Sequence, residues 1–176
     1  GDDRTVANGN PACIGESIAL DATVQGGRDY RWYKDGAEVA EWAGAPQVNL
    51  IENGEYRVNI IFSEACISKG GLNAEFIVPP ERVEIPIDLA ACDVDRNGTE
   101  TFDLSTNGAR MMGLQDTSVY AVTYYSSDAD ARAFTNPIEN PETYETDTSE
   151  TIYARLSSGQ SCSKIASFQL KVQGLD

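Results

Sequence analysis

One loop near the middle of the chain carries the residue types and spacing most suited to chemistry. Asp93, Asp95, Asn97 and Thr99 offer oxygen donors at alternate positions, and Gly98 supplies a turn among them. A hard divalent cation needs several oxygens curled toward one point, so the pattern predicts a structural Ca²⁺ site. The spacing matches only the first half of an EF-hand loop, because its twelfth position is Leu104 and strand-like sequence follows.

The rest of the coordination shell would have to come from outside this loop. Asp103, or the more distant Asp128 and Asp130, could complete it. The alternative is a solvated hairpin turn at Asn97-Gly98 without any metal, since partial loops of this kind often match by chance. The sequence leaves both interpretations open.

Four cysteines form the second candidate group, and landmarks around them repeat. In the first half a cysteine precedes a strand, and a tyrosine precedes the next cysteine by ten residues; in the second half the same order recurs with a gap of nine (Cys13, Tyr56, Cys66; Cys92, Tyr153, Cys162). Of the three possible pairings, the repeat selects Cys13–Cys66 and Cys92–Cys162. Zinc is a poor alternative because no Cys-x-x-Cys spacing exists, and two disulfides indicate an oxidising exterior.

The composition argues against catalysis. The chain has no histidine, so it lacks an imidazole base for a nucleophile and a histidine ligand for zinc. Neither Gly26-Gly27 nor Gly70-Gly71 belongs to a phosphate-binding motif. A carboxylate pair for glycoside hydrolysis is compatible with the composition, but two small sandwiches offer little room for a cleft. We therefore predict no catalytic residues and no enzyme activity.

The charge balance excludes further partners. Asp and Glu number 28 against 13 Lys and Arg, a net charge of −15, and the basic residues are scattered singly. Nucleic acids require clustered cations, and anionic membrane surfaces would repel such a chain. No stretch approaches the ~20 apolar residues of a membrane helix, and the first residues do not resemble a signal peptide. We expect a mature or excised piece without membrane insertion.

The elements that must position these residues are strands. Short alternating runs occur at 17–22, 30–33, 56–60, 75–78, 101–104 and 167–172, and no convincing helical stretch separates them. Asn-Gly or Asp-Gly turns lie at residues 8, 35, 53, 97 and 107. The paired prolines Pro79-Pro80 interrupt strand pairing. The sequence predicts an all-β chain of two tandem Ig-like β-sandwich domains, 1–79 and 80–176, each with one disulfide.

Several aromatic residues have two interpretations. Trp42, Tyr124 and Tyr125 could form a platform for sugar rings, but such residues are more often cross-strand partners on a half-buried sheet, and we favour the second interpretation. Trp32 occupies the place of a core tryptophan in a third strand. The loop at 136–141, rich in Pro and Asn, is either a rigid contact surface or a simple connection.

Both halves resemble parts of known surface proteins. The first half resembles the immunoglobulin-like repeats of large Bacteroidota surface proteins, on the segments Cys13-Ile14-Gly15, Ile18–Ala22, Tyr30–Gly36 and Gly54–Val58. The second half resembles the domain that often follows those repeats, on the segments Pro86–Asp93, Asp95–Gly98, Phe102–Thr106, Val122–Tyr125, Asn136–Ile138 and Thr151–Arg155.

The resemblance carries expectations about location and fold. Such proteins typically end in a gliding-motility-associated sorting domain read by the type IX secretion system, which implies an extracellular or cell-surface location. One departure matters, because in antibody domains the second cysteine lies two residues after the corner tyrosine, whereas here the gaps are ten and nine. The bridges would then tie strand ends or loops, and the fold is Ig-like or closer to a PKD-type sandwich.

These observations favour a non-catalytic structural and presentation module of an adhesin-like bacterial protein. Its partners would be neighbouring repeat domains of the same chain. One alternative is an adhesion module that binds a surface glycan or protein through Trp42, the tyrosine pair or the Asn-Pro loop. A weaker alternative is an accessory domain of an extracellular enzyme.

Overall fold

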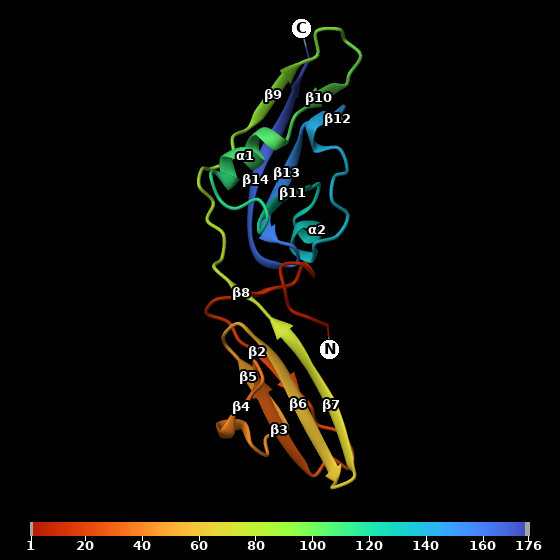
Figure 1. Ribbon diagram of the computed structural model, residues 1–176. Coiled ribbons are helices and arrows are strands. Elements are labelled where there is room, and N and C mark those ends of the chain that lie inside the picture. Colours follow the sequence, from red (N-terminus) through yellow and green to blue (C-terminus); the bar gives the residue numbers. More distant parts are fainter. Residues whose placement is uncertain (1, 175–176) are drawn as a thin grey trace. The chain divides into compact units, whose positions relative to one another are not determined.

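The computed structural model describes residues 2–174 and divides the chain into two compact units, Gly1–Pro79 and Pro80–Asp176 (Figure 1). The division falls within the diproline at which the sequence breaks strand pairing. Each unit is mostly β and encloses a hydrophobic core of its own. Among the described residues, no helix is long and apolar enough to span a membrane.

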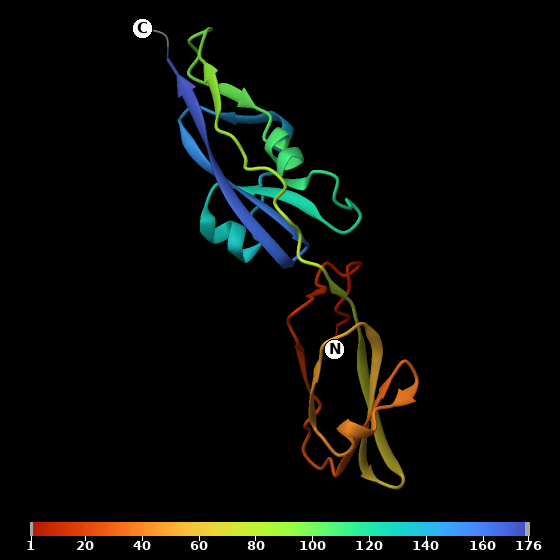
Figure 2. The same cartoon turned by 90° about the vertical axis from the view of Figure 1, so that its left-hand side faces the viewer.

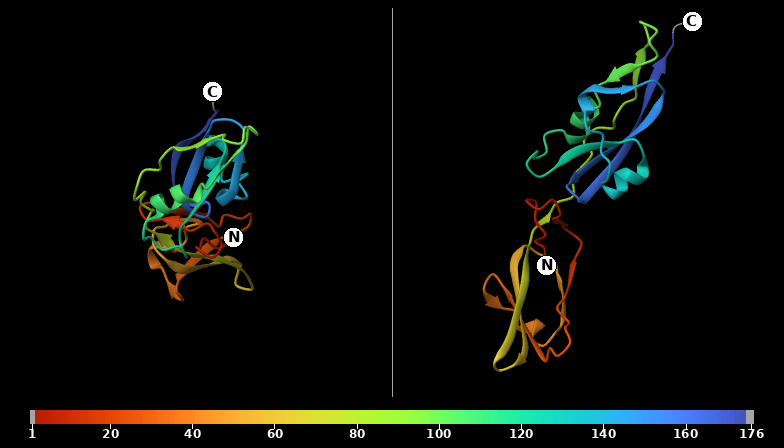
Figure 3. Two further views of the ribbon diagram at one scale, coloured as in Figure 1. Left: turned by 90° about the horizontal axis from the view of Figure 1, so that it is seen from above. Right: turned by 90° about the vertical axis from the view of Figure 1, so that its right-hand side faces the viewer.

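Unit 1 is a sandwich of two layers. One layer has the strand order β4-β3-β6-β7, and the other pairs β2 with β5; β1 runs parallel to β8, which follows β7. The right-hand view of Figure 3 shows the two layers side by side. The elements are β1 (Ala12–Cys13), β2 (Ile18–Asp21), β3 (Asp29–Lys34), β4 (Ala37–Glu38), a 3-10 turn η1 (Ala40–Trp42), β5 (Gln47–Leu50), β6 (Gly54–Ser63), β7 (Cys66–Ala74) and β8 (Phe76–Ile77).

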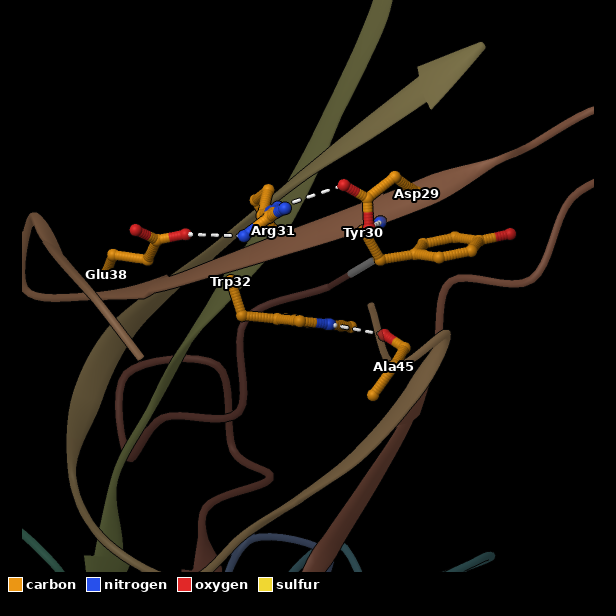
Figure 4. A network of polar contacts seen from close by, with 6 residues as sticks. All are labelled: Asp29, Tyr30, Arg31, Trp32, Glu38 and Ala45. Carbon is orange, nitrogen blue, oxygen red and sulfur yellow. Dashed lines mark hydrogen bonds and ion pairs between the residues drawn. The ribbon is translucent and has the colours of Figure 1, made fainter. Parts of the chain in front are cut away.

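The core of unit 1 is built around Trp32, as its place in the sequence predicts. Trp32 is 1% exposed, and its Nε1 donates to the carbonyl oxygen of Ala45 at 2.7 Å (Figure 4). Tyr56 is equally buried and donates to the carbonyl oxygen of Glu52 at 2.7 Å, which is the hydrogen bond of a tyrosine corner. Strand alternation places these rings inward, so both polar atoms find partners without leaving the core.

The opposite face of β3 is charged. Arg31 lies between Asp29 and Glu38, with nitrogen–oxygen distances of 3.0 and 3.6 Å (Figure 4). All three side chains are partly exposed, so these ion pairs contribute little stability. They mark the solvent face of the sheet, whereas Tyr30 and Trp32 point to the core.

Unit 2 repeats the strand order of unit 1 without a counterpart of β4. Its larger sheet has the order β11-β13-β14-β9, with β9 parallel to β14, and its second layer pairs β10 with β12. The elements are β9 (Leu89–Cys92), β10 (Glu100–Phe102), α1 (Ser105–Met112), β11 (Ala121–Tyr125), α2 (Asp128–Ala133), a 3-10 turn η2 (Pro141–Thr143), β12 (Tyr144–Thr146), β13 (Glu150–Ser158) and β14 (Ser161–Gln173).

Two short helices in unit 2 correct the expectation of a chain without helix. Figure 2 shows α1 and α2 on opposite faces of the larger sheet. In α1, Met111 enters the core, and the buried Asn107 amide accepts from the Ile87 nitrogen at 2.9 Å and donates to the Ile87 oxygen at 2.8 Å. In α2, the Ser127 hydroxyl caps the helix by accepting from the Asp130 nitrogen at 3.2 Å.

The turn signals have mixed outcomes. Asp35-Gly36 forms the predicted tight hairpin, with both residues at positive φ between β3 and β4. Asn107-Gly108 lies inside α1, so the turn predicted there is wrong. Asn53-Gly54 and Asn97-Gly98 lie between strands that pair with other partners, and therefore join no hairpin.

Candidate functional site

The disulfide connectivity differs from the predicted pairing. Cys13 and Cys162 are disulfide-bonded, whereas Cys66 and Cys92 are free thiols and exposed. The chain has four cysteines, so the bond joins Cys13 of unit 1 to Cys162 of unit 2. The predicted bridges Cys13–Cys66 and Cys92–Cys162 are wrong.

Strand geometry gives the reason. Cys13 lies beside Ile77 in the β1–β8 register, and Cys66 begins β7, eleven residues before Ile77. Eleven residues of extended chain span about 36 Å at ~3.3 Å per residue. A disulfide requires Cα atoms within roughly 7 Å of each other, so the two cysteines lie at opposite ends of unit 1 and cannot bond.

The same separation occurs in unit 2. Cys92 lies beside Gln173 in the β9–β14 register, and Cys162 precedes Gln173 by eleven residues along β14. The sequence landmarks therefore identified a true repeat, but each repeat places its two cysteines at opposite ends of its last strand. Pairing within a repeat is excluded by distance, and pairing between repeats is what the structure has.

Cys13 is held in a rigid segment of unit 1. It is buried, and its neighbours Ala12 and Ile14 donate backbone hydrogen bonds to Glu75 and Ile77, both at 2.8 Å. The chain then turns at Gly15, whose φ of 101° favours glycine. The backbone on both sides of the sulfur is thus fixed by the last strand of the unit.

Cys162 lies at the β13–β14 hairpin, where the register shifts between Leu156 and Ser158. Its φ of 57° lies in the left-handed region, which costs a non-glycine residue on the order of 1 kcal/mol. The strand pairing on either side must therefore hold this backbone in place.

Arg155 holds the same hairpin from inside, a role that the sequence did not predict. Arg155 is 3% exposed, and its guanidinium donates to the carbonyl oxygens of Ala131 at 2.8 Å, Arg132 at 3.2 Å and Gln160 at 3.0 Å. The Phe134 ring lies 5.1 Å from its Cζ. Burial lowers the pKa of Arg155. This cation ties the C-terminal end of α2 to the hairpin that carries Cys162.

The acidic loop gathers part of the predicted metal set. Asp93, Asp95 and Glu100 bring carboxylate oxygens within 4.8 Å of one another. Asp93 Oδ2 accepts from the Gly98 nitrogen at 2.8 Å, and Asp93 Oδ1 is buried without a hydrogen-bond partner among the described residues. Asn97 folds back onto Asp95, donating through Nδ2 to Oδ2 at 2.9 Å. An orphaned, buried carboxylate oxygen beside two other carboxylates fits a hard cation.

The remaining predicted ligands are engaged elsewhere. Asp103 Oδ1 accepts from the backbone nitrogen of Ser105 at 2.9 Å at the start of α1, and Asp128 forms an ion pair with Arg132 at 2.7 Å within α2. Thr99 contributes its backbone nitrogen to Asn97 Oδ1 at 2.7 Å. The structure instead adds Glu100, the first residue of β10, which the EF-hand comparison passed over because it expects a glutamate four positions later.

The aromatic residues do not form a sugar platform. Tyr124 and Tyr125 are 4% and 0% exposed, so the favoured interpretation as sheet partners is the correct one. Trp42 packs edge-on against Trp32, with ring centroids 6.2 Å apart, and also lies beside Tyr56. Trp42 packs against the core of unit 1, and Tyr124 and Tyr125 are buried within unit 2.

The Asn-Pro loop is anchored to the sheet. The Ile138 nitrogen donates to the Tyr124 carbonyl at 2.8 Å, and residues of this loop and of β12 line a shallow polar depression. The loop therefore connects strands and also offers an open surface.

Comparison with solved structures finds immunoglobulin-domain proteins. An I-band fragment of titin is 12% identical with a TM-score of 0.39 over 93% of this chain and 62% of the fragment. Sidekick-1 immunoglobulin domains 1–4 are 10% identical, with a TM-score of 0.34 over 99% of this chain and 50% of that one. The N-terminal Ig1-2 module of the Drosophila receptor protein tyrosine phosphatase DLAR is 8% identical, with a TM-score of 0.33 over 93% of each chain.

The chain thus spans less than two thirds of the titin and Sidekick-1 structures. No curated protein matches the sequence significantly. Residues 88–176, which are half of the chain, match a family described as the Flavobacterium inter-domain disulphide bond domain. That description agrees with the bond from Cys13 to Cys162, and the chain belongs to the Flavobacterium inter-domain disulphide bond domain family.

Proposed function

We propose that this chain is a non-catalytic module that spaces and presents other parts of a secreted or cell-surface, adhesin-like bacterial protein. Its immediate partners are neighbouring repeat domains of the same chain. The disulfide between Cys13 and Cys162 carries this proposal, because it joins the two sandwich units covalently. The absence of histidine supports the non-catalytic part.

The bond changes how the chain transmits force. Tension applied at the two ends passes from Cys13 directly to Cys162, so residues 14–161 lie outside the path of the force. Only residues 1–13 and 162–176 remain extensible, and fully extended they reach about 100 Å at ~3.5 Å per residue. The reduced chain could extend to about 600 Å by the same measure. A module built in this way keeps its length under load.

Single-molecule stretching tests the proposal. We expect the oxidised chain, held at its termini, to lengthen by no more than about 100 Å, and the reduced chain to unfold to about 600 Å. Cys162→Ser should behave like the reduced chain, while the matched variant Cys92→Ser, which removes a free thiol, should behave like the oxidised wild type. Full extension of the oxidised chain would refute the mechanical role.

Export by the type IX secretion system, with a place in gliding or adhesion, is part of the same proposal. Its support is the resemblance of both halves to Bacteroidota surface repeats and the flavobacterial family. The test is to locate the full-length protein in the native organism. Surface exposure that disappears when the type IX system is inactivated is the expected result, and unchanged surface exposure in that mutant would contradict it.

We further propose a structural Ca²⁺ site at Asp93, Asp95 and Glu100. Its support is the convergence of the three carboxylates and the unpartnered, buried Asp93 Oδ1. A bound cation would relieve the mutual repulsion of these groups and fix the loop between β9 and β10.

Thermal unfolding with added Ca²⁺ and with a chelator tests this site. We expect Ca²⁺ to raise the midpoint of the wild type and to have no effect on Asp95→Asn. Asp128→Asn is the matched control, because Asp128 pairs with Arg132 in α2, and it should keep the full response to Ca²⁺. An unchanged wild-type midpoint, or an equal response in Asp95→Asn, would remove the site.

A further inference from the structure

We propose that the two free thiols are half-sites of further inter-domain disulfides. Cys92 would bond to a cysteine in a following domain of the same kind, and Cys66 to a cysteine in a preceding one. This inference rests on the proposed function as a spacer among repeat domains and names the contact by which those domains connect.

Cys92 occupies in unit 2 the position that Cys13 occupies in unit 1. Each lies at the end of a short first strand, β9 or β1, that runs parallel to the last strand of its unit. Cys13 is opposite Ile77 and Cys92 is opposite Gln173, each of which ends that last strand. We call Cys13 and Cys92 the first-strand cysteines.

Cys66 likewise corresponds to Cys162. Each follows the turn of the last hairpin, β6–β7 or β13–β14, beside a shift in strand register. From Cys66 to Ile77, and from Cys162 to Gln173, the separation is eleven residues in both units. We call Cys66 and Cys162 the last-hairpin cysteines.

The bonded pair therefore defines a directional rule. It joins the first-strand cysteine of one unit to the last-hairpin cysteine of the next unit along the chain. Applied again, the rule gives Cys92 a last-hairpin partner in the following domain and Cys66 a first-strand partner in the preceding domain. In each case the equivalent residue in the other unit is already bonded, so the position is known to accept such a partner.

The free thiols are accessible to partners from outside. Cys66 and Cys92 are both exposed, and the distance along the last strand prevents either from bonding within its own unit. Among residues 2–174, the Sγ atom of Cys92 has a long contact of 4.0 Å to Gln173 Oε1. In the oxidising exterior that the proposed function implies, an exposed thiol can form a disulfide with a partner cysteine of suitable geometry.

The chemistry balances with a disulfide as oxidant. The thiolate of Cys92 attacks oxidised glutathione, forms a mixed disulfide and releases one reduced glutathione. The partner's last-hairpin thiolate then attacks the Cys92 sulfur and releases the second. Two protein thiols lose two electrons and two protons, and one glutathione disulfide becomes two thiols.

Repetition of the bond limits how much backbone carries the force in an array. With only Cys13–Cys162, the strand β14 beyond Cys162 stays in that path. A bond from Cys92 into the next domain encloses residues 93–176, so the two covalent loops overlap. In an array linked in this way, the backbone left in the force path between successive bonds is limited to the last strand of a unit and the joint that follows it.

A fusion of two full chains in direct succession tests the rule. The forward fusion carries Cys66→Ser in the first copy and Cys92→Ser in the second. The free first-strand cysteine, Cys92 of the first copy, then precedes the free last-hairpin cysteine, Cys66 of the second copy. The reverse fusion carries Cys92→Ser in the first copy and Cys66→Ser in the second. The free last-hairpin cysteine, Cys66 of the first copy, then precedes the free first-strand cysteine, Cys92 of the second copy. Both fusions are oxidised with glutathione, isolated as monomers and analysed by alkylation and peptide mapping.

We expect the free-thiol count to fall from two to zero in the forward fusion, through a Cys92–Cys66 bond, and to stay at two in the reverse fusion. Two free thiols in the forward fusion, or equal oxidation of both fusions, would overturn the inference. The same map reports Cys13–Cys162 in each copy. If Cys13–Cys162 is present but the Cys92–Cys66 bond does not form, this inference fails and the proposed function of the single module stands. If Cys13–Cys162 is absent, the result counts against the inference and against the proposed function.

Discussion

Arg155 and Gln160 are joined across the β13–β14 hairpin by a hydrogen bond of 3.0 Å from the guanidinium Nη2 to the backbone oxygen. The same guanidinium reaches the last carbonyls of α2. Positive charge at the C-terminal end of a helix is favourable, and the three carbonyls replace the water that the buried cation has lost. The hairpin that carries Cys162 is thereby fixed to the body of unit 2.

Replacing Arg155 should destabilise unit 2. We expect Arg155→Met to lower the free energy of unfolding by about 2–4 kcal/mol, because it leaves three carbonyl oxygens without their charged donor. Urea denaturation checks this value. Arg132→Met removes an exposed arginine paired with Asp128 and should cost less than about 1 kcal/mol. Equal losses in the two variants would show that the buried guanidinium has no special role.

Asn107 should prove equally important, although it looks like a turn residue in the sequence. Its side chain makes two hydrogen bonds to the backbone of Ile87 and is fully buried in α1. Asn107→Ala should therefore cost about 2–4 kcal/mol of unfolding free energy, measured by urea denaturation. Asn97→Ala, in the exposed acidic loop, is the comparison and should cost less than about 1 kcal/mol without added metal. An Asn107→Ala variant as stable as wild type would contradict the packing described.

Unit 2 should lose stability at alkaline pH. Burial raises the pKa of Tyr124 to about 12, whereas an unfolded tyrosine titrates near 10. Above pH 10 the unfolded chain releases a proton that the folded chain retains. The stability from this group is therefore complete below pH 10 and falls as pH rises toward 12. Over that window the loss approaches about 2–3 kcal/mol.

Chemical denaturation at pH 8, 10 and 11 measures this effect. Tyr124→Phe should reduce the alkaline decline without removing it, because burial also raises the pKa of Tyr144 in unit 2 to about 12. Tyr33→Phe, on the partly exposed face of β3 in unit 1, should leave the decline unchanged. A decline of the same steepness in Tyr124→Phe and wild type would assign the alkaline sensitivity to other groups.

The sequence predicts the strands of both units because their signal is local. Alternation around Trp32 and Val58, with turn residues such as Asp35-Gly36, is enough to specify a half-buried strand and its hairpin. The helix α1 could not be predicted in this way. Its sequence contains Ser, Thr, Asn and Gly, and its stability comes from the tertiary contacts of Asn107 and Met111.

The sequence predicts only the part of the candidate site that depends on local spacing. The cluster of Asp93 and Asp95 follows from spacing along one loop, whereas the place of Glu100 depends on where β10 begins. The disulfide depends on which end of the last strand each cysteine occupies. Repetition in sequence identifies equivalent cysteines, but it does not say whether equivalent units bond within themselves or to each other. The helix α2 could have been predicted from one local signal, the N-cap residue Ser127 ahead of its first turn.

The connectivity of the four cysteines tests the account most directly. Each lies on its own tryptic peptide: Thr5–Arg28, Val58–Lys69, Val83–Arg96 and Leu156–Lys164. After alkylation and digestion of the unreduced 176-residue chain, mass spectrometry should find Thr5–Arg28 linked to Leu156–Lys164, with Cys66 and Cys92 alkylated. A linkage of Thr5–Arg28 to Val58–Lys69, or of Val83–Arg96 to Leu156–Lys164, would contradict the account.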